Sequence, residues 1–228
     1  VRKLLDKENS LKRNRTILEG EEKFDKDLWN SLVSMGLTAV TIPEEFGGIG
    51  MGYLELCVIA EELGRAIAPV PYSSSVYLAT TAILNCASDE IKKEFLPKLA
   101  SGEIIGTFAH AESSGFPLEK SINCNFASGK ISGTKAAVPD ADIADFAIVS
   151  AKSSSGVGLY LVDLKDPNIE ITSLDTFDPS RSHANIDIKD ASAKELISGG
   201  WLEIEKILDQ SAVLFSFEQI GGAEAAMN

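Results

Sequence analysis

Apolar side chains in the first hundred residues recur every three or four positions, which is the spacing of one face of an α-helix. Phe24, Leu28, Leu32 and Met35 follow this pattern, and Gly36 stands where such a helix would end. The same spacing predicts helices over residues 24–36, 53–63, 73–86 and 90–99.

Short signals at the ends of these segments support the assignment. We expect Gly64 to cap the second helix, and Ser88 to begin the fourth helix as its N-cap. Residues 1–20 are polar and charged and carry no strong apolar period. They are predicted to form a frayed arm or a surface helix.

The pattern changes at Gly102, after which the segments become short, alternating and rich in β-branched residues. Ser128 and Gly129 separate two such segments and predict a β-hairpin turn. We expect a compact antiparallel barrel or sandwich of roughly 90 residues. Its predicted strands are 104–111, 122–126, 130–138, 145–151, 158–163, 169–174 and 184–188.

The helical period returns from about Ser192 and predicts one long helix with apolar residues on several faces, from Leu202 to Ile220. A lone helix of this kind does not stay exposed to water, so we expect a partner bundle from further sequence or from another subunit. The chain starts at Val1 without Met and ends inside this helix, so both ends are expected to be incomplete.

The expected fold class is therefore α+β with several domains. We expect an N-terminal α-helical bundle over 1–102 and a middle antiparallel β-barrel or sandwich over 103–191. The start of a C-terminal helical bundle follows over 192–228.

Composition narrows the classes of function. A net charge of −13, with a pI near 4.6, argues against binding to nucleic acid or to anionic membranes. Cys57, Cys86 and Cys124 show no C-x-x-C spacing, so we expect buried thiols in a reducing compartment and neither a disulfide framework nor a metal site. No apolar run reaches about 18 residues, and no signal peptide is visible, so no membrane span is expected.

A glycine-rich stretch, LTAVTIPEEFGGIGMG over 37–52, invites comparison with a dinucleotide-binding loop. The fingerprint G-x-G-x-x-G does not fit glycines 47, 48, 50 and 52. In addition, Pro43 interrupts the preceding segment, and the carboxylates of Glu44 and Glu45 would repel a pyrophosphate. We therefore reject a dinucleotide site here.

The same stretch resembles the N-terminal domain of acyl-CoA dehydrogenases. That family carries Pro-Glu-Glu-(Phe/Tyr)-Gly-Gly followed by Glu-Glu-Leu-Gly, and this chain has IPEEFGG over 42–48 and EELG over 61–64. LPKLASG over 96–102 and FEQIGGA over 217–223 also resemble family segments. The family's domain order is helical, β and helical, as expected here.

The resemblance implies an FAD-dependent oxidoreductase that dehydrogenates an acyl-CoA thioester between its α and β carbons. A glutamate on the C-terminal bundle removes the α-proton in the family while the β-hydrogen leaves as hydride to the flavin. Because this chain stops before that bundle is built, we name no catalytic residue.

The resemblance also implies an acyl-CoA substrate from fatty acid or sterol side-chain metabolism and an electron-transfer flavoprotein as acceptor. It implies a homo- or hetero-oligomer, dimer or tetramer, in the cytoplasm of a bacterium or, as the alternative, in a mitochondrial matrix.

Flavin contacts are assigned by this resemblance to two segments. In FAHAESSG over 108–115, Glu112 anchors the comparison, and Ala111 stands where the family has a flavin-binding Thr. His110 is either a functional histidine beside the flavin or a strand histidine with a local hydrogen bond. The assigned flavin contacts are Phe108, His110, Ala111 and Gly115, and the assigned substrate contacts are Ser113 and Ser114.

The second segment is GTKAAVPD over 133–140, and its flavin contacts are Ala137, Val138 and Pro139. Ala137 replaces the Trp that packs on the flavin, and Pro139 replaces a hydrogen-bonding Thr. Since proline has no N–H, the backbone amides of Ala111, Ala137 and Val138 are the expected donors.

These departures leave alternatives open. The first interpretation is an acyl-CoA dehydrogenase, and the second is a non-catalytic partner subunit of a heteromeric enzyme with a degenerate flavin site. A flavin monooxygenase or oxidase on the same scaffold is the third. Arg181 is interpreted as a structural ion-pair partner rather than as a phosphate ligand.

Overall fold

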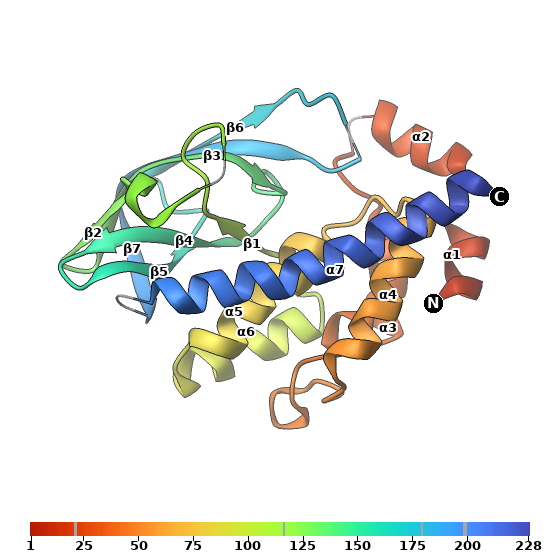
Figure 1. The fold of residues 1–228 in the computed structure, drawn as a ribbon, viewed down its shortest axis with the longest axis horizontal. Helices are drawn as coiled ribbons and strands as arrows, with labels where there is room; N and C mark the ends of the chain where they lie inside the picture. The colour runs from red at the N-terminus through yellow and green to blue at the C-terminus, as the bar shows by residue number, and fades with distance from the viewer. Residues whose placement is uncertain (21, 116, 179, 198–199) are drawn as a thin grey trace.

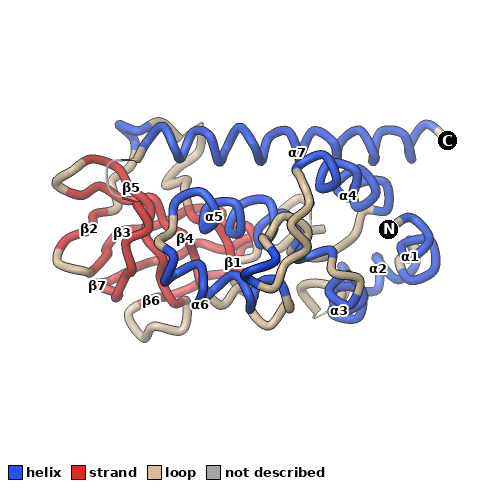
Figure 2. The backbone as a smooth tube through the Cα atoms, turned by 90° about the horizontal axis from the view of Figure 1, so that it is seen from below, coloured by secondary structure: helices blue, strands red, loops and turns tan. Residues whose placement is uncertain are grey.

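The computed structural model describes residues 1–20, 22–115, 117–178, 180–197 and 200–228. The strands gather at one end of an elongated molecule and the first helices at the other (Figure 1). One long helix, α7 (Trp201–Met227), runs along a side of both parts, and the two chain termini lie at the helical end (Figures 1 and 2).

The four predicted N-terminal helices are confirmed. Ser88 caps the last of them, accepting a hydrogen bond from the Ile91 amide at 3.4 Å, and Gly36 follows the first in the left-handed conformation at φ 72°. The predicted helix over 73–86 begins as a π-helix and continues as an α-helix. The bounds are α3 (Lys26–Ser34), α4 (Tyr53–Ala66), π-helix η3 (Ser73–Thr80), α5 (Thr81–Cys86) and α6 (Asp89–Ala100).

The expected role of Gly64 as a helix cap is wrong. Helix α4 continues to Ala66 and ends at Ile67, which takes the left-handed conformation at φ 48°. Gly64 instead faces α7, where a Cβ atom would lie 2.0 Å from the Glu218 carbonyl oxygen. The glycine is there because two helix backbones meet at this point.

Residues 1–20 form two short surface helices, α1 (Arg2–Glu8) and α2 (Leu11–Glu19), rather than a frayed arm. Arg2 pairs with Glu62 on α4, and the Asn14 side chain donates to the carbonyls of Ala66 and Ile67. These contacts, together with fully buried Leu5, fasten the segment to the helical core.

The glycine-rich stretch contains no strand, which agrees with the rejection of a dinucleotide site. Its regular parts are two single turns of 3₁₀-helix, Leu37–Ala39 and Glu44–Phe46. Gly48 folds back onto the chain so closely that a Cβ atom would lie 1.8 Å from the Ile42 carbonyl oxygen. The glycines therefore serve a compact loop that leads into α4.

The middle of the chain forms a closed barrel. Pairings run from β4 to β2, β3, β7, β5 and back to β4, while β1 adds to β4 and β6 adds to β7. Ser128 and Gly129 both have positive φ, 51° and 76°, and form the predicted hairpin turn. The strands are β1 (Gly106–Ala109), β2 (Asn125–Ala127), β3 (Lys130–Pro139), β4 (Phe146–Ser153), β5 (Gly156–Asp163), β6 (Ile169–Leu174) and β7 (His183–Ile197).

The expectation of a purely antiparallel sheet is wrong, because β1 pairs with β4 in parallel. Both strands start from the end of the barrel that touches the helices. The backbone N–H of Ile105 donates to the Asp145 carboxylate at 2.9 Å, and the Asp145 N–H donates back to the Ile105 carbonyl at 2.8 Å. The hairpin β2–β3 lies between them in sequence, and β2 also pairs in parallel with β4 at one position.

The helical period expected from about Ser192 begins later than predicted. Strand β7 continues to Ile197, because its last residues pair with β5, and α7 starts at Trp201. We therefore propose a boundary after Ile197 for the last segment in place of 191. Helix α7 buries Ile204, Ile207 and Leu214 against the rest of the chain.

The outer side of α7 remains apolar and exposed in this chain. Leu202 is 71% exposed, and Val213, Ile220 and Met227 follow it at separations that place all four on one helical face. We predict that further helices or another subunit cover this face.

Candidate functional site

A cleft of about 360 Å³ lies where the barrel meets α7. Its barrel side is formed by the end of β1 and by β3, and its other side by Leu208, Ala212 and Phe215 of α7. Residue Leu78 of the π-helix contributes to the wall. Residues from both predicted segments thus line one space, although 24 residues lie between Ala111 of the first and Ala136 of the second.

Most of the residues assigned to the flavin line this cleft. They are Phe108, His110, Ala111, Ala137, Val138 and Pro139. Gly115, Ser113 and Ser114 do not line it, and all three are exposed. Since β1 ends at Ala109, the chain has left the barrel wall before it reaches them. Their assigned contacts stay predictions.

Sequence reasoning missed the contribution of α7 to the cleft. The apolar period of that helix predicted that the helix is buried. It did not indicate that Leu208, Ala212 and Phe215 line the cleft. It also missed Trp201, whose ring centroid lies 5.7 Å from that of His110.

A bulge in β3 shapes the floor of the cleft. The register with β7 shifts between Lys135 and Val138, and Ala137 takes the left-handed conformation at φ 48°. This turn directs the Ala137 N–H to the side-chain oxygen of Asn185 at 3.0 Å. The Ala137 amide is therefore not a free donor, contrary to expectation.

The amide of Ala111 offers a different case. Its carbonyl accepts a hydrogen bond from the Ala136 N–H at 2.8 Å, which joins the two predicted segments directly. Its own N–H has no hydrogen-bond partner among the described residues. The Ala111 amide is therefore a candidate donor in a residue that lines the cleft.

A chain of buried polar groups supports the wall behind the cleft. The fully buried ammonium of Lys135 donates to Glu112 Oε1 at 2.8 Å, to Ser150 Oγ at 3.0 Å and to the His110 carbonyl at 3.1 Å. Ser150 Oγ in turn lies 2.9 Å from His110 Nδ1. The four side chains come from two strands and the loop after β1, so they fix that loop against the barrel.

The protonation states of the groups in this polar cluster are set by burial and by neighbouring charges. Burial, with the Lys135 charge nearby, lowers the pKa of His110 to about 4, so its ring is neutral near pH 7. Burial opposes ionisation of Glu112, but the Lys135 ammonium and the Cys124 amide together lower its pKa below the ordinary value. Glu112 and Lys135 therefore form an ion pair beside a neutral imidazole.

Known proteins resemble this chain in sequence and in fold. The family model described as "Acyl-CoA dehydrogenase, N-terminal domain" matches residues 1–103. Acyl-CoA dehydrogenase FadE27 of Mycobacterium tuberculosis is 32% identical over 157 residues, an alignment that covers 68% of this chain and 42% of the relative. The chain belongs to the acyl-CoA dehydrogenase family.

Other known proteins are also similar to this chain. The mitochondrial isovaleryl-CoA dehydrogenase of Solanum tuberosum is 35% identical over 102 residues, covering 44% of this chain and 25% of the relative. A variant of the Tcur3481-Tcur3483 steroid ACAD superimposes with a TM-score of 0.88 at 29% identity, covering 99% of this chain and 62% of that one. The ChsE4-ChsE5 complex of Mycobacterium tuberculosis gives a TM-score of 0.87 at 26% identity, covering 98% and 61%.

This chain spans 42% of the length of FadE27 and 62% of the steroid ACAD chain, less than two thirds of each. Among the residues that the structure describes, no helix has both the length and the apolar content needed to cross a lipid bilayer.

A second polar cluster confirms Arg181 as an ion-pair partner. Its guanidinium donates to Glu218 Oε2 on α7 at 2.6 Å and to Ser73 Oγ on the π-helix at 2.6 Å. The Tyr77 hydroxyl donates to the other Glu218 oxygen at 2.9 Å. The cluster joins the helical part, the barrel and α7.

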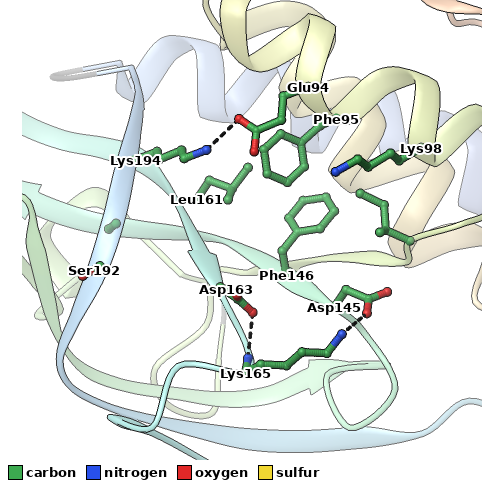
Figure 3. Close-up of a pocket in the computed structure, with 12 residues that line it drawn as sticks. Glu94, Phe95, Lys98, Asp145, Phe146, Leu161, Asp163, Lys165, Ser192 and Lys194 are labelled. Atoms are coloured by element: carbon green, nitrogen blue, oxygen red, sulfur yellow. Dashed lines mark hydrogen bonds and ion pairs between the residues drawn. The ribbon is translucent and has the colours of Figure 1, made fainter.

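A further pocket, of about 420 Å³, opens on another side of the barrel beside α6 (Figure 3). Phe95 and Phe146 meet edge to face, at 5.1 Å between centroids, while Lys194 pairs with Glu94 and Lys165 with Asp145 (Figure 3). None of the predicted site residues lines it. Because most of its charges are paired with one another, it is a weaker candidate than the cleft.

Proposed function

We propose that this chain supplies the flavin-facing half of an FAD-dependent acyl-CoA dehydrogenase that oxidises an acyl-CoA thioester between its α and β carbons. The observation that carries the proposal is the cleft itself. Two segments assigned to the flavin from sequence alone converge there under α7, and the direct bond between Ala136 and Ala111 holds them together.

The residues of the cleft fit a flavin ring. Its walls are largely apolar, and Ala111, Ala136 and Ala137 leave room where bulkier side chains would fill the space. Two polar groups with no partner among the described residues, the Ala111 amide and His110 Nε2, are available to acceptor atoms on a ring edge. A planar heteroaromatic group with oxygen and nitrogen acceptors matches this set.

When bound, FAD would supply the hydride acceptor. The chain's own residues would position the ring and keep water away from it. Leu78, Phe108 and Phe215 would provide the apolar cover, and the Ala111 N–H would hold the ring edge. We place the base that removes the α-proton on further helices of the C-terminal bundle, beyond residue 228.

Finer features of the proposal come from the resemblance to relatives. We propose an acyl-CoA from fatty acid or sterol side-chain metabolism as substrate and an electron-transfer flavoprotein as acceptor. We also propose a dimeric or tetrameric assembly in the cytoplasm, with the exposed face of α7 covered by helices of the assembly.

A non-catalytic partner subunit is the second candidate. It is favoured by the shortage of donors, because the Ala137 amide is bonded to Asn185 and Pro139 has none. The ChsE4-ChsE5 complex, which superimposes on this chain, is consistent with such an assembly.

The two candidates are separated by flavin content. The protein is purified alone and with its presumed partner, and flavin absorbance is compared with protein concentration. Stoichiometric flavin on the lone protein supports the first candidate and rejects the second. Colourless protein that raises its partner's activity supports the second, and colourless protein without effect on the partner rejects both.

A pair of variants on α7 locates the flavin. Ala212→Trp fills the cleft and is expected to abolish flavin retention, whereas Ser216→Trp, one turn along on an exposed position, is the matched control and should retain it. Equal flavin content in both variants would place the cofactor elsewhere.

A further inference from the structure

His110 carries an unexplained polar atom in the wall of the cleft. Its side chain is only 6% exposed, and its Nε2 has no hydrogen-bond partner among the described residues. The nearby Ser211 hydroxyl, by contrast, is bonded to the carbonyls of Tyr77 and Ile207. A buried nitrogen left unpaired is costly and rare in folded proteins, so a partner is expected.

The hydrogen bonds around Ser150 determine which ring nitrogen carries the proton. Lys135 has only protons to give, so it occupies one lone pair of Ser150 Oγ at 3.0 Å. The Ser150 hydroxyl proton can then point to His110 Nδ1 at 2.9 Å or to the His110 carbonyl at 3.4 Å. That carbonyl already accepts from Lys135 at 3.1 Å.

Nδ1 is the nearer of the two acceptors and receives no other hydrogen bond from the described residues, so the Ser150 hydroxyl donates to it. A neutral imidazole that accepts at Nδ1 carries its proton on Nε2. The ring cannot take a second proton easily beside the Lys135 ammonium, which Glu112 anchors at 2.8 Å. The cluster thus presents a neutral N–H donor.

We propose that His110 is a cofactor-binding residue whose Nε2–H donates to an acceptor atom on the edge of the flavin ring, in a tautomer fixed by Ser150, Lys135 and Glu112. This inference rests on the proposed function and adds a donor to it. It compensates for the threonine hydroxyl that Ala111 lacks and for the amides lost at Ala137 and Pro139. Ser150 and Lys135 are positioning residues, because they act through His110.

The position of the ring supports this role. It lies between two aromatic side chains, with centroid distances of 5.9 Å to Phe108 and 5.7 Å to Trp201. These neighbours restrict rotation, while the bond to Ser150 fixes the Nδ1 side. A donor held in this way loses little freedom when a ligand binds.

The first test uses NMR to determine which ring nitrogen of His110 carries the proton. The chain contains two histidines, His110 and His183, so ¹⁵N spectra of labelled protein are readily assigned with single variants. Near pH 7 we expect His110 Nε2 to show the shift of a protonated nitrogen, and we expect FAD to move that shift. In Ser150→Ala the two tautomers should mix. A proton on Nδ1, or an Nε2 shift that bound FAD leaves unchanged, would overturn the proposal.

The second test measures FAD affinity by the quenching of flavin fluorescence. His110→Phe keeps an aromatic ring but removes the donor, and it should weaken FAD binding about tenfold, which corresponds to one hydrogen bond. His110→Gln, which retains an N–H donor, should restore part of the affinity. His183→Phe is the control, since His183 lies outside the cleft and bonds the Arg181 carbonyl.

The outcomes separate this inference from the proposed function. If wild-type protein binds FAD and His110→Phe binds it equally well, the donor role fails and the proposed function stands. If the wild type binds no FAD alone or with its partner, both fail. Matching thermal denaturation curves for the variants and the wild type exclude misfolding as the cause, and His110→Gln decides if His110→Phe is unstable.

Discussion

The basic side chains of His110 and Lys135 both lie within hydrogen-bonding distance of the Ser150 hydroxyl. Each would carry a positive charge if protonated. Only one of them can be charged at modest cost in a buried site. Lys135 has the carboxylate of Glu112 as its partner, so the lysine keeps its proton and the histidine stays neutral. The division of charge follows from which group has the acid beside it.

This division predicts a stability that depends on pH. The pKa of His110 is lowered to about 4, so below pH 6.5 the unfolded chain binds a proton that the folded protein excludes. The free energy of unfolding should therefore fall as the pH drops, by roughly 2–3 kcal/mol from this residue at about pH 4.5. Urea unfolding at about pH 7 and pH 4.5 measures it.

The control for this prediction is His110→Gln, which has no titrating ring. All other groups titrate in both proteins, so the variant should lose less stability on acidification by the amount given above. An equal loss in the two proteins would show that His110 does not stay neutral in the folded state.

Sequence reasoning left two roles open for His110; the structure shows the local hydrogen bond of one of them, and the contact with a flavin stays a prediction. The local hydrogen bond to Ser150 was anticipated in kind, but neither Ser150 nor Lys135 could be named as its partner. They lie 40 and 25 residues away along the chain and become neighbours only through strand pairing. The bulge that turns the Ala137 amide toward Asn185 was invisible for the same reason.

At the scale of elements, the crossing of α4 and α7 depends on two glycines. A Cβ atom on Gly64 would lie 2.0 Å from the Glu218 carbonyl oxygen, and one on Gly221 would lie 1.9 Å from that of Glu61. Both are backbone atoms of regular helices, so neither neighbour can move alone. The helices approach closely because each presents a glycine to the other.

Substitutions at Gly64 and Gly222 form a matched pair of variants that tests this crossing. Gly64→Ala should destabilise the protein by roughly 1–3 kcal/mol or more, because the overlap outweighs the gain of up to about 1 kcal/mol in helix propensity. Gly222→Ala should be neutral or stabilising, because its Cβ would make an ordinary contact at 3.5 Å with the Gly64 carbonyl. Thermal or urea unfolding of both variants tests the contrast, and a Gly64→Ala protein as stable as Gly222→Ala would refute it.

Sequence periodicity located these helices well and their ends less well. Gly64 was interpreted as a cap because a glycine after an apolar run commonly ends a helix, yet Ile67 takes that role. A glycine required for close packing and a glycine required for a turn look alike in a single sequence. The late start of α7 has a similar cause, since only pairing with β5 shows that residues up to Ile197 are still a strand.

At the scale of the whole molecule, one ion pair joins the three structural parts. Glu218 on α7 accepts from Arg181, which follows β6, and from Tyr77 of the π-helix. Arg181 also donates to Ser73 and lies over the Phe215 ring at 6.0 Å. The pair holds α7 against both the barrel and the helices, and so it also keeps the α7 wall of the cleft in place.

Breaking this pair should affect the entire fold. Glu218→Ala leaves the Arg181 charge and the Tyr77 hydroxyl without their partner, and we expect a loss of about 3–5 kcal/mol. Asp209→Ala removes an exposed carboxylate from the same helix and should change stability by less than about 0.5 kcal/mol. Urea unfolding followed by fluorescence and by circular dichroism measures both, and similar losses for the two variants would contradict the assigned role.

The contact between Glu61 and Gly221 also bears on how the polypeptide emerges from the ribosome. These positions are 221 − 61 = 160 residues apart. At ribosome speeds of about 5–20 residues per second, α4 is synthesised roughly 8 to 32 seconds before the segment that covers it. During that interval the nascent helical part exposes the groove that α7 later fills. Its solubility then depends on molecular chaperones or on the acidic character of the chain rather than on its final packing.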